Sequence, residues 1–191
     1  MSQAVARPAS LPLAWWGMLM LVASEGTLFG CLFGTYFYLR SESTQWPPQG
    51  LPAPALTLPI VLTAALVVSA LPLRVASRRA RAGGLFSTPL LVVAALAIQG
   101  AYFGLALHDF DRQLDSFTPQ TDAYGSIYYV LLGADHAHVA AGLLLDVWLL
   151  LKLTRGLTAF RIRAVRAIAL YWYAVALLTA LVTATLLSAR L

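Results

Sequence analysis

The chain has 191 residues, of which 60% are hydrophobic and only 11% are charged, and its formal net charge is +5. This composition disfavours a soluble globular domain, because a protein surrounded by lipid needs apolar side chains on its outside as well as in its core. The single cysteine, Cys31, excludes a disulfide framework and a thiolate zinc cage, and its apolar surroundings predict a small buried hydrophobe.

Five apolar segments follow along the chain, and each is long enough to cross a hydrocarbon core of ~30 Å as a helix. They cover residues 13–39, 53–73, 85–107, 124–151 and 164–189. The expected fold class is therefore all-α: a polytopic bundle of five transmembrane helices that forms one integral membrane domain over residues 1–191, with no soluble domain appended. A signal peptide cleaved near Ala23 is a weaker interpretation, because the apolar run continues well past that residue.

The loops between these segments predict the orientation of the chain. The N-terminus and the second and fourth loops carry ten of the 13 basic residues and no acid. These ten are Arg7, Arg74, Arg78, Arg79, Arg81, Lys152, Arg155, Arg161, Arg163 and Arg166. By the positive-inside rule this side is cytoplasmic, so the N-terminus lies inside and the C-terminus outside. Because topology accounts for the positive charge, we expect no nucleic-acid partner.

Ionisable side chains occur inside two of the segments, where a charge is costly and usually marks function. Glu25 lies in the first segment, and Asp135, His138 and Asp146 lie on one face of the fourth. With a rise of about 1.5 Å per residue, Glu25 and His138 both lie roughly 18–20 Å from the cytoplasmic ends of their helices. We therefore predict a hydrogen bond between Glu25 and His138 if the two helices touch.

The other polar residues of the fourth segment have simpler expectations. His136 points about 100° away from Asp135, so it belongs to a different face. Asp146 lies close enough to the cytoplasmic end to meet interfacial water or Lys152, and we expect a solvated or ion-paired acid there.

Glu25 itself has more than one interpretation. A protonated Glu25 can tie two helices together by a hydrogen bond worth ~1 kcal/mol. It can instead handle protons, because an acid in apolar surroundings can exchange them, and contact with a lipid or ligand is a third interpretation. Beside it, Gly26, Gly30 and Gly34 form a small-xxx-small face, which predicts the close approach of another helix.

The sequence argues against a self-sufficient redox enzyme. His108 lies at an outer interface, and His136 and His138 point to different faces of one helix, so no two histidines can hold a haem between two helices. One cysteine cannot form a thiolate copper centre, and no Gly-rich phosphate loop stands out. We expect no catalytic residue, metal site or cofactor in this chain.

Three motifs stand out in the first, third and fourth segments. They are SEGTLFGCLFGTYF at residues 24–37, the Ile98-Gln99 pair, and DAYGSIYY at residues 122–129. They are similar, in the same order, to the patterns S-E-x-x-[FL]-F-x-x-L-F-x-[AT]-Y-F, I-Q-x-x-E (of which only the start matches) and D-x-Y-G-S-x-[FY]-[FY]. Together the motifs resemble a known family, subunit III of the haem-copper cytochrome c oxidases.

The resemblance implies the short, five-helix bacterial form of subunit III. The first two helices would form one side of a lipid-filled V-shaped cleft and the last three the other. Haem and copper would lie in the partners, catalytic subunit I and copper-bearing subunit II, and bound phospholipid would be this chain's own ligand. Basic side chains on the cytoplasmic side attract anionic headgroups; the expected contacts are Arg74, Arg78, Arg79, Arg155 and Arg163.

Several positions depart from the family pattern. Asp135 replaces the first histidine of the family's H-x-x-H, whose second histidine matches His138. Tyr102 takes the place of the family's glutamate in the third helix, and the last helix lacks the family's histidine and aspartate. Glu25, the acid of the family signature, is present.

The function expected is that of a noncatalytic subunit III of a bacterial haem-copper terminal oxidase in the inner membrane. The complex would oxidise cytochrome c, reduce O2 to water and translocate protons. This chain would support assembly, lipid binding and proton uptake, with Glu25, His138 and Asp135 as its intramembrane proton or hydrogen-bond site. The electron donor, the partner's haem type and membership of a respiratory supercomplex stay open.

Two alternatives belong beside this interpretation. One is a subunit-III-like accessory protein of a nitric oxide reductase. The other is a small proton-coupled carrier that uses Glu25 and Asp135, although the second and fifth segments have few polar residues to form a substrate path.

Overall fold

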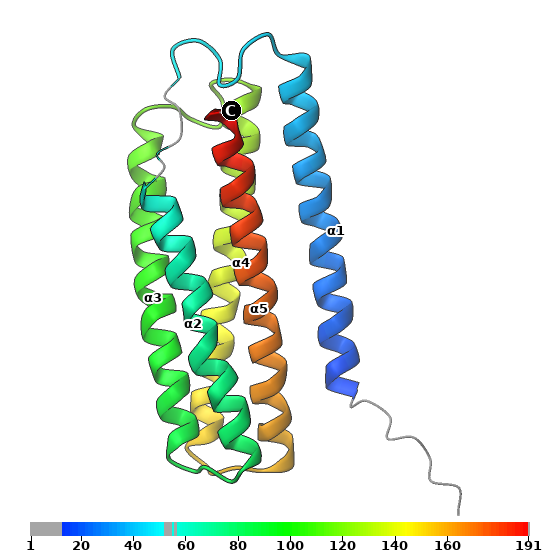
Figure 1. Cartoon of the computed structure of the whole chain (residues 1–191), viewed down its shortest axis with the longest axis vertical. Coiled ribbons are helices and arrows are strands. Elements are labelled where there is room, and N and C mark those ends of the chain that lie inside the picture. The colour runs from blue at the N-terminus through cyan, green and yellow to red at the C-terminus, as the bar shows by residue number, and fades with distance from the viewer. Residues whose placement is uncertain (1–12, 52–54, 56, 191) are drawn as a thin grey trace, which may run out of the picture.

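The computed structural model describes residues 13–51, 55 and 57–190, and within these ranges it is all-α. Its elements are α1 (Leu13–Glu42), α2 (Thr57–Arg81), α3 (Ser87–Leu114), α4 (Ala123–Leu153), α5 (Ala159–Leu187) and the short 3-10 helix η1 (Ser188–Arg190) (Figure 1). The five α-helices are each long and apolar enough to span a membrane, which confirms the predicted fold class. Arg7 and residues 53, 54 and 56 of the expected second segment lie outside the described residues.

Local sequence accounts for where the helices begin and turn. The Asp122 side chain accepts a hydrogen bond of 2.7 Å from the Gly125 N–H and so caps the first turn of α4. The loops after α2 and α4 pass through Gly83 (φ +77°) and Gly156 (φ +86°). Glycine adopts this left-handed backbone without the steric cost that a Cβ would bring, so both chain reversals stay tight.

The up-and-down course of the helices gathers charge at the two ends of the bundle (Figure 1). The acidic end, at the top of Figure 1 with the C-terminus, carries Glu42, Asp109, Asp111, Asp115 and Asp122. The basic end, at the bottom, carries Arg74, Arg78, Arg79, Arg81, Lys152, Arg155, Arg161, Arg163 and Arg166.

The helices do not divide as the resemblance implied. α2 and α4 each pack against both α3 and α5, so α2 to α5 form a four-helix bundle. α1 packs against α4 and α5 from the side, and no packing joins α1 to α2 among the described residues. The expectation that the first two helices form one side of a V-shaped cleft is therefore wrong. Residues 43–51, which follow α1, cross the acidic end, and α2 begins away from α1 (Figure 1).

An aromatic cluster holds α1 to the bundle at the acidic end. The ring of Trp46, in the loop after α1, lies edge-on to Tyr36 of α1 at 5.4 Å and to Tyr124 of α4 at 5.0 Å between centroids. Phe117 packs on Tyr124 from the loop before α4. Edge-to-face ring pairs contribute about 0.5–1.5 kcal/mol beyond the area they bury. Trp46 therefore ties both the loop and α1 to α4.

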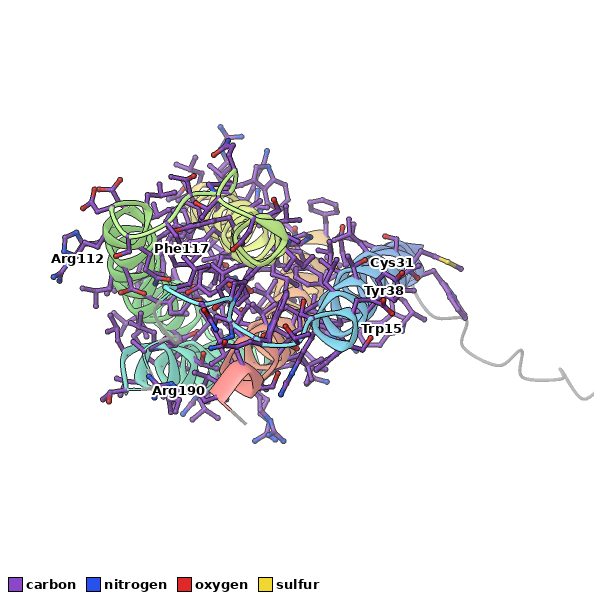
Figure 2. The ribbon with its side chains drawn as sticks, turned by 90° about the horizontal axis from the view of Figure 1, so that it is seen from above. Trp15, Cys31, Tyr38, Arg112, Phe117 and Arg190 are labelled. Atoms are coloured by element: carbon purple, nitrogen blue, oxygen red, sulfur yellow. The ribbon has the colours of Figure 1, made fainter. Side chains whose placement is uncertain are left out.

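Most of α1 faces outward. Phe29 and Tyr36 are its fully buried side chains among those described, whereas Met20, Leu28 and Phe37 are exposed. Cys31 is exposed as well, and it points away from the bundle (Figure 2). The prediction of a buried Cys31 is wrong, because α1 has helices of the chain on one side only.

The predicted glycine packing face also lies on this outward side. No atom from elsewhere in the described chain comes within 4 Å of where a Cβ would stand on Gly26, Gly30 or Gly34. The prediction is therefore wrong for packing inside the chain. Close approach occurs instead at Gly142 of α4, where a Cβ would lie 2.6 Å from the Trp172 ring of α5.

Candidate functional site

Glu25 and His138 meet between α1 and α4. Glu25 Oε2 lies 2.6 Å from His138 Nε2, so the hydrogen bond expected from their matching depths is present. The other ring nitrogen, Nδ1, lies 2.6 Å from the carbonyl oxygen of Ala134. A carbonyl oxygen only accepts, so Nδ1 carries a hydrogen and donates it.

This tautomer places one proton between the two side chains. Either a neutral Glu25 carboxyl donates to the lone pair on His138 Nε2, or an imidazolium donates to a carboxylate. The pair has no net charge in either arrangement. An uncharged pair costs far less within a bilayer than a lone carboxylate would.

The pair is only partly covered by the rest of the chain. The side chain of His138 is 18% exposed and that of Glu25 is 24% exposed. The ring of Phe29 packs edge-on against the His138 ring at 5.3 Å, and the Tyr171 hydroxyl donates to the His138 carbonyl at 2.8 Å. The backbone and ring of His138 are thus held in place, while one edge of the pair faces outward.

Asp135 belongs to a separate site. Its Oδ1 accepts from the Thr179 hydroxyl at 2.6 Å, and its Oδ2 accepts from the Tyr102 hydroxyl at 3.3 Å. It is buried among α3, α4 and α5, and within the described residues no hydrogen bond joins it to Glu25 or His138. Its expected place in one site with Glu25 and His138 is therefore wrong. Helical periodicity correctly placed Asp135 on one face of α4 with His138 and Asp146. It does not tell which neighbouring helix each of these residues contacts.

Two of the departures from the family pattern are in contact with each other. The resemblance implies a glutamate at position 102 and a histidine at position 135, and the tyrosine and aspartate present there share a hydrogen bond. The contact joins α3 to α4. The sequence did not identify Tyr102 and Thr179 as site residues. The two departures from the family pattern, at positions 102 and 135, were a signal that could have identified Tyr102.

Asp146 forms a third buried group. It is fully buried, and the Gln99 side chain lies against it. With the Gln99 amide turned so that its nitrogen faces the two acceptors, Nε2 donates to Asp146 Oδ2 at 2.8 Å and to the Ala95 carbonyl at 3.1 Å. Lys152 instead places its Nζ over the ring of Trp148, 5.8 Å from the centroid. The expectation of a solvated or Lys152-paired acid is wrong, because Asp146 faces α3 rather than the basic end.

His136 has one satisfied ring nitrogen and one without a partner. Nδ1 lies 2.5 Å from the Leu132 carbonyl, and the buried Nε2 has no hydrogen-bond partner among the described residues. The ring lies 5.5 Å from that of Phe110. In the same described part of the chain, no group of three or more His, Cys, Asp and Glu side chains could hold a metal ion.

A basic pocket opens at the basic end, between the start of α1 and the facing parts of α2 and α5. Its volume is about 250 Å³, and its lining includes Arg74, Arg78, Arg81, Arg166, Trp15 and Tyr173. The predicted headgroup contacts Arg74 and Arg78 line it, whereas Arg79, Arg155 and Arg163 do not. Arg81 and Arg166 also line it; they lie in the basic clusters at 74–81 and 155–166 but were not among the expected contacts, because only helix packing shows which members of each cluster face each other.

Comparison with known proteins gives one family match. A family model described as cytochrome c oxidase subunit III matches residues 11–186. The match covers all five helices from just before α1 to the last turn of α5.

Several curated bacterial proteins are similar to the chain over most of its length. The probable cytochrome c oxidase subunit 3 of Nocardia farcinica is 27% identical, over 82% of this chain and 78% of the relative. The cytochrome bo(3) ubiquinol oxidase subunit 3 of Pseudomonas aeruginosa is 28% identical, over 82% and 76%. The cytochrome c oxidase subunit 3 of Bacillus subtilis is 26% identical, over 82% and 77%.

Proposed function

Because the chain belongs to the cytochrome c oxidase subunit III family, we propose that it is the noncatalytic subunit III of a bacterial terminal oxidase that oxidises cytochrome c, reduces O2 to water and translocates protons. Family membership makes it a subunit of a haem-copper oxidase complex, in which it partners with subunits I and II. Subunits of this family carry no redox centre, so haem and copper belong to the partners. The match over residues 11–186 is the observation that carries the proposal.

We place the whole chain, as a single multi-pass domain, in the bacterial inner membrane with the basic end toward the cytoplasm. The separation of basic residues from acids along the five helices supports this orientation, because positive side chains are retained on the cytoplasmic side.

The Glu25–His138 pair is the proposed proton site of the subunit. Support comes from the proton that the two side chains share and from the partial exposure of both at one edge of the chain. A group that can pass its proton to a neighbour needs such an open edge. Through this pair the subunit would support proton uptake and lasting turnover by the complex.

The outward face of α1 is the proposed contact with catalytic subunit I. Gly26, Gly30 and Gly34 leave a ridge without side chains, on which a helix of another subunit can approach closely. The exposed apolar residues beside the ridge, such as Leu28 and Phe37, suit either lipid or a transmembrane partner.

Anionic phospholipid is the proposed ligand of the basic pocket. Four guanidinium groups surround the pocket, and each basic residue near a membrane surface contributes about 1 kcal/mol toward an anionic headgroup. Trp15 and Tyr173 in its lining are residue types that favour the headgroup level. The positive electrostatic potential at this end would be increased by three further residues that do not line the pocket, Arg79, Arg155 and Arg163.

Purification in mild detergent tests the assignment. A tagged chain should bring down a complex with a haem spectrum, subunits I and II, and oxygen uptake supported by reduced cytochrome c. Oxygen uptake driven only by quinol would replace the proposed donor, and reduction of nitric oxide would favour the accessory-protein alternative. Recovery of the chain as a monomer without an oxidase partner would overturn the proposal.

A further inference from the structure

The interior of the four-helix bundle holds a cavity that the proposed function does not use. Its lining is mainly apolar, with polar side chains at intervals along it. The cavity lies between α2, α3, α4 and α5, and about 60 Å³ of it can hold the centre of a water molecule. Asp135, Tyr102 and Thr179 lie at its base, and Asp109, Gln113 and Tyr128 lie toward the acidic end. Since one water needs about 10–15 Å³ of such space, the cavity has room for a few waters.

Polar groups follow one another along this cavity. At the base, Asp135 accepts from Tyr102 and Thr179. One helical turn further along α5, Thr183 shares a hydrogen bond of 2.7 Å with Thr63 of α2. Asp109 lies seven residues beyond Tyr102 on α3, roughly 10 Å along the helix axis.

The acidic end of the cavity is polar as well. Asp109 accepts from Gln113 Nε2 at 2.6 Å, and Gln113 accepts in turn from the Tyr128 hydroxyl. Polar atoms are therefore present at the base, in the middle and at the acidic end, which is the arrangement a file of water requires.

His136 lines the cavity beside this row of polar groups. The side chain is 9% exposed, and its buried Nε2 has no hydrogen-bond partner among the described residues. Because Nδ1 faces a carbonyl and must donate, Nε2 is an acceptor in the neutral ring and a donor in the cation. Nε2 is covered by protein atoms in this conformation, so the path for water is set by the other polar groups of the lining.

The lining of the cavity also favours water over an anion or a metal ion as the occupant. The lining holds no Lys or Arg that could pair with an anion, and no set of three metal-binding side chains exists in the described part of the chain. From the described lining, α2 and α5 contribute threonine hydroxyls but no titratable group. The titratable groups around Asp135 are Tyr102, Asp109, Tyr128, His136 and, one helical turn away, His138.

We propose that this cavity holds a file of water that carries protons between Asp135 and the acidic end of the chain, past His136 and Asp109. A proton leaves the Asp135 carboxyl for a water oxygen, and successive waters pass one proton each until the Asp109 carboxylate accepts one. Each acceptor gains the proton that its donor loses, and no electron moves. The path is separate from the Glu25–His138 pair and does not depend on the oxidase assignment.

Infrared difference spectroscopy on the chain in its purified complex tests the proposal. The C=O band of the protonated Asp135 carboxyl is identified by its loss in Asp135→Asn, and it should shift to lower frequency when the solvent is changed to D2O. Absence of an Asp135-dependent carboxyl band at every pH, or a band that does not shift in D2O, would overturn the water file.

Two variants then test the route. Ala106→Val adds bulk to the lining between Asp109 and Asp135, and Thr183→Val removes a hydroxyl while keeping the side-chain shape. Both variants should slow the exchange of the Asp135 carboxyl proton for deuterium. Their C=O band should therefore remain unshifted after the time in D2O that is sufficient for the unmodified chain. Ala101→Val, on the exposed side of α3, is the matched control and should leave the shift unchanged. If both lining variants shift as fast as the control, the proposed route is wrong.

Discussion

Glu25 is tolerated in the membrane because it is half of a neutral pair. The Ala134 carbonyl fixes His138 with its Nδ1 hydrogen bonded to the backbone, so Nε2 is left to share a proton with Glu25. The contact therefore joins α1 to α4 and stores a proton at the same time. The sequence left two interpretations of Glu25 open, a structural hydrogen bond and proton handling. They differ in whether the complex needs the helix contact or the shared proton.

Replacing Glu25 by glutamine separates these properties. The amide of Glu25→Gln can donate to His138 Nε2, so the helix contact should survive while the exchangeable proton is lost. We expect normal amounts of purified complex and a faster decline of oxygen uptake during sustained turnover. Glu25→Ala leaves Nε2 without its partner and should cost about 1–3 kcal/mol of stability, which makes it the comparison. Failure of Glu25→Gln to assemble would favour the purely structural role.

The rise per residue along a helix and the angle between residues around it were enough to predict the Glu25–His138 contact. They were not enough to predict the surroundings of Asp135. Depth along a helix follows from sequence position alone, so two residues at one level can be paired if their helices touch. The partner of Asp135 depends on which helices lie beside α4, and the Tyr102 and Thr179 hydroxyls come from α3 and α5. That information lies in the packing of the bundle and not in the pattern of any one segment.

At the scale of the helices, α4 and α5 approach each other through Gly142. The Trp172 ring occupies the space where a side chain at position 142 would stand. The glycines of α1 lie at the opposite extreme, with open space beside them within the described chain. The same residue type thus serves internal packing on α4 and faces outward on α1.

Alanine substitutions should expose this difference. Gly142→Ala forces the new methyl group against the Trp172 ring and should destabilise the chain by about 1–3 kcal/mol, seen as a lower thermal midpoint in detergent. Gly30→Ala is the matched control and should leave the midpoint unchanged. A bulky Gly30→Leu should instead weaken association with subunit I. Equal midpoints for Gly142→Ala and Gly30→Ala would contradict the packing described here.

On the scale of the whole molecule, charge is divided between the two ends. The basic pocket combines two residues from the predicted headgroup set with Arg81 and Arg166, which come from different helices. The pocket faces the start of α1 through Trp15, so a lipid bound there would touch α1, α2 and α5 together. Lipid would then join α1 to α2, which share no direct packing among the described residues.

Neutralising the pocket should release that lipid. The double variant Arg78→Gln/Arg166→Gln removes two of its cations and should lower the amount of anionic phospholipid retained through purification, measured by native mass spectrometry. Arg79→Gln removes a neighbouring charge that does not line the pocket and should retain the lipid. The difference between the variants should shrink at high salt. Unchanged retention in the double variant would refute the lipid site.

The number of helices and the division of charge could be predicted from the sequence, and the arrangement of the helices could not. Length and hydropathy locate spans because each helix satisfies its own backbone in lipid. The neighbours of α1 depend instead on the loop after it, where Trp46 packs between Tyr36 and Tyr124 and holds α1 beside α4. No periodicity within a segment encodes that choice, which is why the expected pairing of the first two helices was wrong.

The contact between Tyr102 and Asp135 also makes positions 102 and 135 a linked pair. A glutamate at position 102, which the resemblance implies there, would face Asp135 as a second buried carboxyl, and two such groups cannot both ionise. A histidine at position 135 would instead meet the Tyr102 hydroxyl without a clash of charge. The side chains that either position can accept therefore depend on the residue present at the other.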